Sequence, residues 1–244
     1  MSKVVQNDLE YLRQKYPGVS EIVSQQGGLM TRPGGECDYY KCEEWMKKNI
    51  CQSGFIEIGS AWGASFHLWG SVISEGPKIS VDYMDLENYP FFSLTHFSNR
   101  NKTWMKHFDD AHVVYGKSSC PEVIDTVGNI LNGRKVGWLY IDGNHTYQSA
   151  LIDYGLYKQF VKVGGYIGFH DISDGEIRPH HMHYNTSWQV YSEIKHHKLL
   201  MDTTFDPDWK EYRNAVNHET EYYKLNWVWE TTTGDGIGIF QVEE

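Results

Sequence analysis

Residues 54–63, GFIEIGSAWG, decide the fold of this 244-residue chain. A short apolar run that closes on glycine is typical of a buried β-strand. The residues that follow, ASFHLWGSVISE at 64–75, space Phe66, Trp69 and Ile73 about one helical turn apart. The stretch therefore predicts a strand, a glycine loop and a helix in succession.

The same unit recurs in weaker form along the chain. Further apolar runs bounded by turn residues predict short buried strands: KISVDY at 78–83, HVVYG at 112–116, VGWLYID at 136–142 and GYIGFHD at 165–171. Between the last two, residues 146–163 have helical spacing. Strands that alternate with helices imply a parallel sheet with right-handed crossovers. The predicted fold is α/β, a doubly wound, mostly parallel, Rossmann-like sheet that GIGIFQV at 236–242 closes as an antiparallel strand.

The chain length suits one main α/β domain with modest additions. Residues 1–50 are expected to form an N-terminal helical cap, because their helical segments are broken at Pro-Gly and Gly-Gly steps. Residues 51–244 then form the α/β domain. Its strand and helix rhythm stops after Ile172, and the segment 173–224 is expected to be a lid-like insertion with a helix over 186–197.

Composition narrows the classes of partner and compartment. The chain has 22 Lys and Arg against 32 Asp and Glu, a formal net charge of -10, which opposes adhesion to nucleic acid. It has no run of about 18 uncharged apolar residues, and its polar start lacks the pattern of a signal sequence. We therefore expect a cytoplasmic protein without a membrane partner. The four cysteines lack the paired CxxC spacing of a zinc site, which favours reduced thiols.

Glycines and acids stand at the strand ends, where ligands bind in open α/β sheets. At Gly59 and Gly63 the backbone can approach a ligand closely, and the helix that follows offers free N–H groups. The next strand ends at Asp82, which follows Glu57 by nearly the offset of about 20 positions at which an acid accepts the ribose hydroxyls of a nucleoside cofactor. Ser118 follows the third strand and is a candidate adenine contact. The alternative for the glycine loop is a tight structural turn, and the alternative for Asp82 is a solvated Asp in a turn.

Two carboxylates and two imidazoles follow the fourth and fifth strands, at Asp142, His145, His170 and Asp171. Carboxylate oxygens suit a hard divalent ion such as Mg²⁺, so Asp142 and Asp171 are candidate ligands. His145 is the candidate base, because the ordinary pKa of an imidazole, about 6.5, lies near neutral pH. The alternative is that Asp142 caps the following helix and that His145 is a surface turn residue.

The strings FIEIGSAWGAS, LYIDGNHTYQSALIDYGLY and VKVGGYIGFHDI resemble the class I S-adenosylmethionine-dependent methyltransferases. The resemblance spans roughly residues 52 to 172 and is strongest to the branch of macrocin-type sugar O-methyltransferases and cephalosporin hydroxylase-like proteins. It implies that S-adenosylmethionine is the cofactor, that Asp142 and Asp171 hold a divalent metal, and that His145 is the base. The expected cofactor contacts are Glu57, Gly59 and Gly63 to the methionine part, Asp82 to the ribose, and Ser60, Ser65, Ser118 and Asp142 beside them.

One position departs from this pattern. The residue before Asp171 is His170, where the metal-dependent members that it most resembles tend to have an acid. Imidazole suits transition metals better than Mg²⁺. His170 is therefore included among the metal ligands with three alternatives open: it is not a ligand, the metal differs, or no metal binds.

Other polar and aromatic clusters have no assigned role. His180, His181 and His183, with Arg178 beside them, either complete a metal site, contact an acidic substrate or belong to a solvated lid. Aromatic residues of the C-terminal third fit a core or an oligomer contact better than a pocket wall. They are Trp209, Tyr212, Tyr222, Tyr223, Trp227 and Trp229.

The function predicted is S-adenosylmethionine-dependent O-methylation of a hydroxyl on a small molecule or sugar, with a divalent metal such as Mg²⁺ as an optional participant. The sequence does not fix the oligomeric state, and a homo-oligomer is one alternative. The rival predictions are a metal-dependent hydroxylase of the cephalosporin hydroxylase-like branch and a non-catalytic cofactor-binding subunit. A nicotinamide-dependent dehydrogenase fits poorly, because the glycine spacing departs from GxGxxG.

Overall fold

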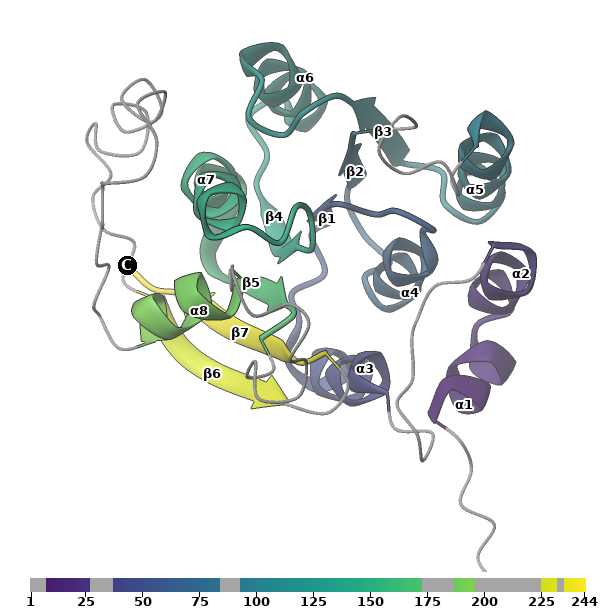
Figure 1. The fold of residues 1–244 in the computed structure, drawn as a ribbon, viewed down its shortest axis with the longest axis horizontal. Helices are drawn as coiled ribbons and strands as arrows, with labels where there is room; N and C mark the ends of the chain where they lie inside the picture. The colour runs from purple at the N-terminus through teal and green to yellow at the C-terminus, as the bar shows by residue number, and fades with distance from the viewer. Residues whose placement is uncertain (1–7, 27–36, 84–92, 173–186, 196–224, 232–234) are drawn as a thin grey trace, which may run out of the picture.

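A computed structural model describes residues 8–26, 37–83, 93–172, 187–195, 225–231 and 235–244 (Figure 1). The helices are α1 (Asp8–Lys15), α2 (Pro17–Gln26), α3 (Asp38–Asn49), α4 (Ala64–Val72), α5 (Leu94–His107), α6 (Pro121–Leu131), α7 (Tyr147–Tyr157) and α8 (Ser187–Lys195), with a 3-10 turn, η1 (Lys158–Phe160). The strands are β1 (Phe55–Ile58), β2 (Lys78–Asp82), β3 (Ala111–Tyr115), β4 (Val136–Ile141), β5 (Val161–His170), β6 (Leu225–Thr231) and β7 (Ile237–Val242).

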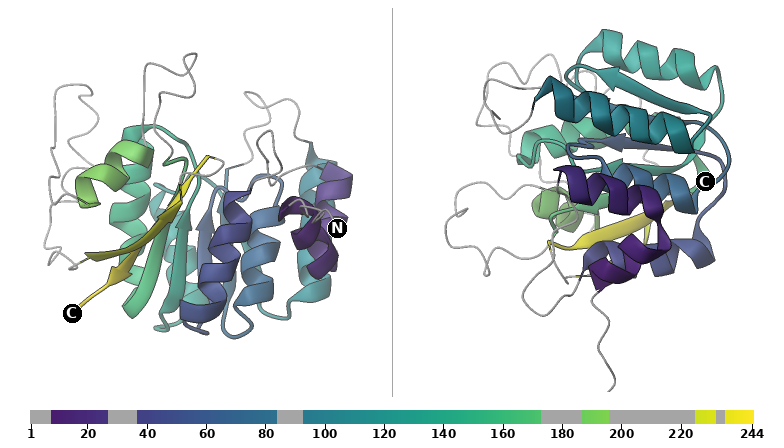
Figure 2. Two further views of the ribbon diagram at one scale, coloured as in Figure 1. Left: turned by 90° about the horizontal axis from the view of Figure 1, so that it is seen from below. Right: turned by 90° about the vertical axis from the view of Figure 1, so that its right-hand side faces the viewer.

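The strands form one sheet in the order β3-β2-β1-β4-β5-β7-β6. The pairs from β3 through β5 are parallel, whereas β7 runs antiparallel to β5 and β6 antiparallel to β7. In Figure 2 (left), the yellow strands β6 and β7 lie beside β5 at one end of the sheet, and the purple N-terminal helices lie toward the other end. The predicted fold class, including the closing antiparallel strand, is confirmed.

Helices cover both faces of the sheet. Successive side chains of a strand point to opposite faces, so they pack alternately against the two helix layers. In β4, Leu139 and Ile141 pack into the cluster that includes α6, α7 and α8. The alternate residues Trp138 and Tyr140 pack into the cluster of α1 to α5. Figure 1 shows these two layers on either side of the sheet. Strands β1, β2 and β4 are buried on both faces, as their nearly continuous apolar sequences predict.

The N-terminal helices lie directly on the α/β core. Helix α2 packs against α4 and α5, and a Cβ at Gly18 would lie only 1.8 Å from Nε2 of His67 in α4. Helix α3 packs on α4, β6 and β7. The helical character expected for this segment is present in α1, α2 and α3, while its division from the rest as a separate cap stays a prediction.

The structure differs from the expected elements in three places. The helix expected over 146–163 ends at Tyr157, and β5 begins at Val161, because Val161 pairs with Val136 and a register shift follows in that ladder. Residues 94–107 and 121–131 form α5 and α6, which no sequence pattern above predicts. The segment 225–231 forms strand β6, in which Trp227 is 43% exposed.

Several predictions fall on residues that the structure does not describe. The lid-like insertion lies mostly outside the described ranges, as do the histidine cluster and most of the C-terminal aromatic residues. These residues are Arg178, His180, His181, His183, Trp209, Tyr212, Tyr222 and Tyr223. Among the helices that are described, none is long and apolar enough to cross a bilayer.

Candidate active site

The loop between β1 and α4 is bent by glycines that leave no room for a side chain. Gly59 and Gly63 have left-handed backbone torsions, with φ of 85° and 87°. A Cβ on Gly59 would lie 2.1 Å from the carbonyl oxygen of Asp142, and one on Gly63 would lie 2.4 Å from the ring of Trp104. Helix α4 begins directly after Gly63, so the free N–H groups of its first turn lie at the edge of the sheet where β1 ends.

Glu57 is fully buried beside this loop, and only one of its two side-chain oxygens has a hydrogen-bond partner among the described residues. Its Oε2 accepts a hydrogen bond from Ser60 Oγ at 3.0 Å, and Ser60 in turn accepts one from Ser80 at 2.8 Å. Within the described part of the chain, Oε1 of Glu57 has no hydrogen-bond partner. Burial raises the pKa of Glu57 to about 8, although hydrogen bonds from Ser65 and Ser60 counteract it. Glu57 is therefore a buried carboxyl group, neutral at pH 7, with one oxygen that has no partner among the described residues.

Asp82, at the end of β2, is paired with an arginine from α5. Nη1 of Arg100 donates to Oδ2 of Asp82 at 2.7 Å and also to the carbonyl oxygen of Ala61 in the glycine loop. The guanidinium is fully buried and lies over the rings of Phe97 and Trp104, at 4.7 Å and 4.5 Å from their centroids. Arg100 therefore joins the glycine loop to the predicted ribose acid, a link that no sequence motif marks.

Replacing Arg100 with methionine is expected to lower the free energy of unfolding by about 3 kcal/mol, since it leaves the Asp82 carboxylate without its buried partner. Urea denaturation measures the change. Arg13→Met is the matched control, because Arg13 pairs with Glu10 across 3.9 Å near the surface, where a pair contributes at most about 1 kcal/mol. Equal losses of unfolding free energy in the two variants would show that the pair of Arg100 and Asp82 contributes no more to stability than a surface pair.

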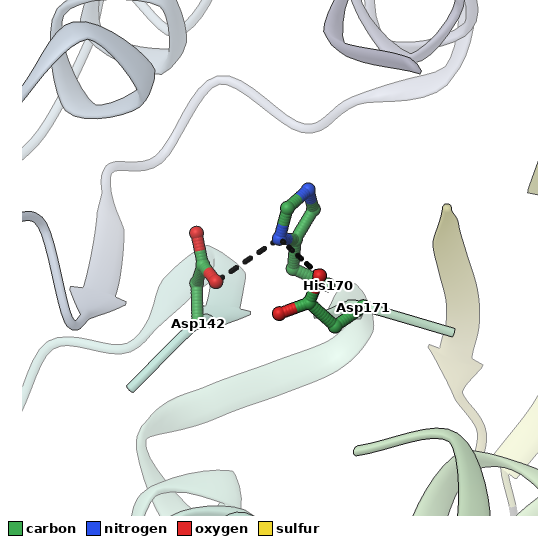
Figure 3. Close-up of side chains that lie close together, drawn as sticks. All are labelled: Asp142, His170 and Asp171. Carbon is green, nitrogen blue, oxygen red and sulfur yellow. Dashed lines mark hydrogen bonds and ion pairs between the residues drawn. The ribbon is translucent and has the colours of Figure 1, made fainter. Parts of the chain in front are cut away.

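Asp142, His170 and Asp171 gather where β4 and β5 end (Figure 3). Ile141 of β4 pairs with Phe169 of β5 in parallel register, which brings the residues after them to one edge. One ligand atom from each of the three side chains lies within 4.8 Å of the others. Nδ1 of His170 lies 3.1 Å from Oδ1 of Asp142 and 3.7 Å from Oδ1 of Asp171.

His145 joins the same cluster from the loop before α7. Its Nδ1 lies 2.6 Å from Oδ2 of Asp171 and its Nε2 lies 3.4 Å from Oδ1 of Asp142, while its side chain is 52% exposed. The helix is capped by Thr146, whose hydroxyl accepts the N–H of Ser149. The alternative in which Asp142 caps this helix is therefore wrong.

Within the cluster, each carboxylate and each imidazole stabilises the charged form of the other, which shifts their pKa values in opposite directions. Burial alone would raise the pKa of Asp142, yet the charge of His170 and hydrogen bonds from His145 and His170 hold it well below its ordinary value. Burial alone would lower the pKa of His145, yet hydrogen bonds to Asp142 and Asp171 raise it to about 10. His145 is thus protonated at neutral pH without a metal, unlike the ordinary imidazole assumed from the sequence. The two charged carboxylates are thus the reason that this imidazole keeps its proton.

Two residues of α3 complete the cluster. The hydroxyl of Tyr39 donates to Oδ2 of Asp142 at 3.3 Å, and the rings of Tyr39 and His170 lie 5.2 Å apart. Oδ2 of Asp38 lies 3.1 Å from Nε2 of His170. These pairs are 103 and 132 positions apart in the chain, so no local sequence pattern marks Asp38 or Tyr39.

Ser118 lies apart from this cluster. It follows β3, which is separated from β4 by β2 and β1 in the sheet. Its carbonyl oxygen accepts a hydrogen bond from the hydroxyl of Tyr157 at 2.9 Å. The adenine contact expected of Ser118 stays a prediction.

Residues 56–172 match a family model described as "Methyltransferase domain". This segment, just under half of the chain, is similar to methyltransferase domains. The matched range begins in β1 and ends just after β5, so it contains the glycine loop, Asp82 and both histidines of the cluster. The resemblance to class I S-adenosylmethionine-dependent methyltransferases is thereby confirmed for the domain.

A relative of known sequence is similar to about half of this chain. The chain is 38% identical over 128 residues to "Uncharacterized protein R132" of Acanthamoeba polyphaga mimivirus, a match that covers 51% of this chain and about half, 54%, of that protein.

Solved structures share the fold at low sequence identity. MycE methyltransferase from the mycinamycin biosynthetic pathway, in complex with Mg, SAH and mycinamycin VI, is 12% identical with a TM-score of 0.53, over 94% of this chain and 55% of that one. The SAH-bound methyltransferase PaMTH1 of Podospora anserina is 10% identical with a TM-score of 0.50, over 100% and 99% of the two chains.

Proposed function

We propose that this protein transfers a methyl group from S-adenosylmethionine to a hydroxyl group of a small molecule or sugar. The observation that carries the proposal is the buried, unpartnered Oε1 of Glu57 at the edge of the sheet where Asp142, His145 and Asp171 converge. Class I methyltransferases place a cationic cofactor beside nucleophile-activating groups at such an edge, and the family match supports this use.

The residues present fit S-adenosylmethionine. Its ammonium group is a donor of the kind that the unpartnered oxygen of Glu57 lacks. Gly59 and Gly63 keep the loop free of side chains, Ser60 and Ser65 flank the Glu57 carboxylate, and Asp82 keeps one oxygen beyond its bond to Arg100 for the ribose hydroxyls. When bound, the cofactor supplies a methyl group on a positively charged sulfur.

The donor set also fits a divalent ion. Asp142 and Asp171 would hold it with His170 beside them, since their ligand atoms already lie close together. A bound ion would make a hydroxyl more acidic and would offset the two carboxylates that keep His145 protonated. His145, the most exposed member of the cluster, would take the hydroxyl proton. The solved MycE complex contains Mg, which supports a metal in this chain as well.

The remaining expectations belong to the same proposal. The acceptor is a small hydroxylated molecule, and the presence of mycinamycin VI in the MycE structure supports a small-molecule substrate. We propose no nucleic-acid or membrane partner, and the net charge of -10 opposes adhesion to nucleic acid. We further propose a cytoplasmic location, a cap at 1–50 and a lid over 173–224 that shapes the acceptor site, with the oligomeric state left open.

The purified chain, supplied with S-adenosylmethionine, a divalent ion and a panel of sugars and other alcohols, is expected to release S-adenosylhomocysteine and a methyl ether that mass spectrometry identifies. EDTA is expected to suppress the release. Cofactor binding without release against any acceptor would favour a non-catalytic subunit. Consumption of oxygen and 2-oxoglutarate would favour the hydroxylase.

A further inference from the structure

Asp38 reaches the active site from outside the matched methyltransferase segment. It is the first residue of α3, and its side chain is 1% exposed. Its Oδ1 accepts the N–H of Tyr39 at 2.9 Å, and its Oδ2 accepts the N–H of Gly236 at 3.1 Å. The carboxylate is thus fixed by α3 on one side and by the start of β7 on the other.

The same carboxylate faces one nitrogen of His170. Oδ2 of Asp38 lies 3.1 Å from Nε2, in the buried core of the site. A ring nitrogen that donates to a carboxylate fixes the tautomer, so that the other nitrogen keeps its lone pair for a metal. In metal sites, a histidine ligand almost always has such a partner behind it.

The other nitrogen of His170 faces the predicted metal ligands. Nδ1 lies 3.1 Å from an oxygen of Asp142 and 3.7 Å from an oxygen of Asp171. Two ligand atoms about 2.1 Å from one ion and at right angles lie about 3.0 Å apart. The separation from Asp142 therefore suits two adjacent ligands of one ion, and Asp171 lies close enough to join them, since ligand atoms of all three side chains lie within 4.8 Å of one another (Figure 3).

We propose that Asp38 is a positioning residue that makes His170 a metal ligand through Nδ1, and that the resulting set of two carboxylates and one imidazole prefers a first-row transition-metal ion such as Mn²⁺ to Mg²⁺. This inference rests on the proposed function, since it concerns the same metal site. Mg²⁺ takes oxygen ligands and retains water, whereas imidazole adds affinity for transition metals. Asp38 thereby gives a role to the histidine that departs from the family pattern.

Calorimetric titration of the full chain with Mn²⁺ and with Mg²⁺, each alone, tests the preference. The wild-type protein is expected to bind Mn²⁺ at least about tenfold more tightly than Mg²⁺. Asp38→Ala is expected to weaken Mn²⁺ binding by about 10- to 100-fold, the usual effect of losing an outer-shell partner, and Asp38→Asn, which keeps an uncharged acceptor, to fall between. Asp8→Asn is the matched control, because Asp8 accepts the N–H of Cys37 beside α3 without touching His170, and Mn²⁺ affinity is expected to stay unchanged.

Pulsed electron paramagnetic resonance of Mn²⁺ in the wild-type protein needs no variant and is expected to detect an imidazole nitrogen on the ion. Absence of that nitrogen, equal affinities for the two ions, or full Mn²⁺ affinity in a folded Asp38→Ala would overturn the inference. Binding of S-adenosylhomocysteine is measured in the same samples and is expected to persist in Asp38→Ala. If the wild-type protein binds no S-adenosylhomocysteine, the proposed function fails separately from the role of Asp38.

Discussion

Replacing Glu57 with glutamine is expected to stabilise the protein against unfolding and to weaken its binding of S-adenosylmethionine by at least about 30-fold. Burial raises the pKa of Glu57 from 4.5 to about 8. Between these values the unfolded chain has released a proton that the folded chain keeps, so wild-type stability falls as pH rises. At pH 7 this cost is about 3 kcal/mol, and glutamine, which does not titrate, avoids it.

The loss of binding has a different cause. Glu57 is neutral in the free protein at pH 7, but a bound ammonium group would favour its charged form, which glutamine cannot adopt. Removing one partner of a buried charge pair costs about 2 kcal/mol or more, which corresponds to the 30-fold weakening. Calorimetry with the cofactor and urea denaturation at pH 5 and pH 7 measure the two effects. The stability gain is expected to be larger at pH 7.

Glu43→Gln is the matched control, because Glu43 is equally buried but well partnered. Its carboxylate pairs with Lys15 at 2.6 Å and Lys47 at 3.1 Å and accepts the hydroxyl of Tyr16. Glutamine at position 43 is therefore expected to lower stability and to leave cofactor binding intact. If Glu57→Gln is destabilised like Glu43→Gln and still binds the cofactor, Glu57 is a structural residue only.

Replacing Asp142 with asparagine is expected to reduce the turnover number by about 10²- to 10⁴-fold. Asp142 is a proposed metal ligand and contacts both His145 and His170. A metal contributes several kcal/mol to the stabilisation of developing charge, and a positioned base increases the rate further. Because the Asp142 carboxylate would hold the metal and also contacts His145, its loss is expected to have a large effect. The rate of S-adenosylhomocysteine release at saturating substrate measures it.

Asp125→Asn, on the exposed side of α6, is the control for the same chemical change and is expected to keep full turnover. Circular dichroism verifies that Asp142→Asn is folded. A folded Asp142→Asn that retains wild-type turnover and wild-type metal affinity would remove this carboxylate from the mechanism.

The sequence predicts those parts of the site that local patterns encode. The apolar runs that end at Gly59, Asp82, Asp142 and His170 form β1, β2, β4 and β5, and parallel pairing brings three of their ends together. Each such run is short, continuous and bounded by turn residues, which are the local features that favour a buried strand.

The parts that depend on distant contacts could not be predicted in this way. Asp38 and Arg100 reach the site only because α3 and α5 pack on the core, and neither stands in a motif. The raised pKa of His145 is likewise not encoded locally, because it depends on how close Asp171 comes in space. Strand β5 starts earlier than expected because Val161 finds its partner in β4.

The most direct test of the central claim is a calorimetric titration of the full chain with S-adenosylhomocysteine. We expect saturable binding of one molecule per chain, competed by S-adenosylmethionine. An absence of binding in folded wild-type protein, with and without a divalent ion, would contradict it.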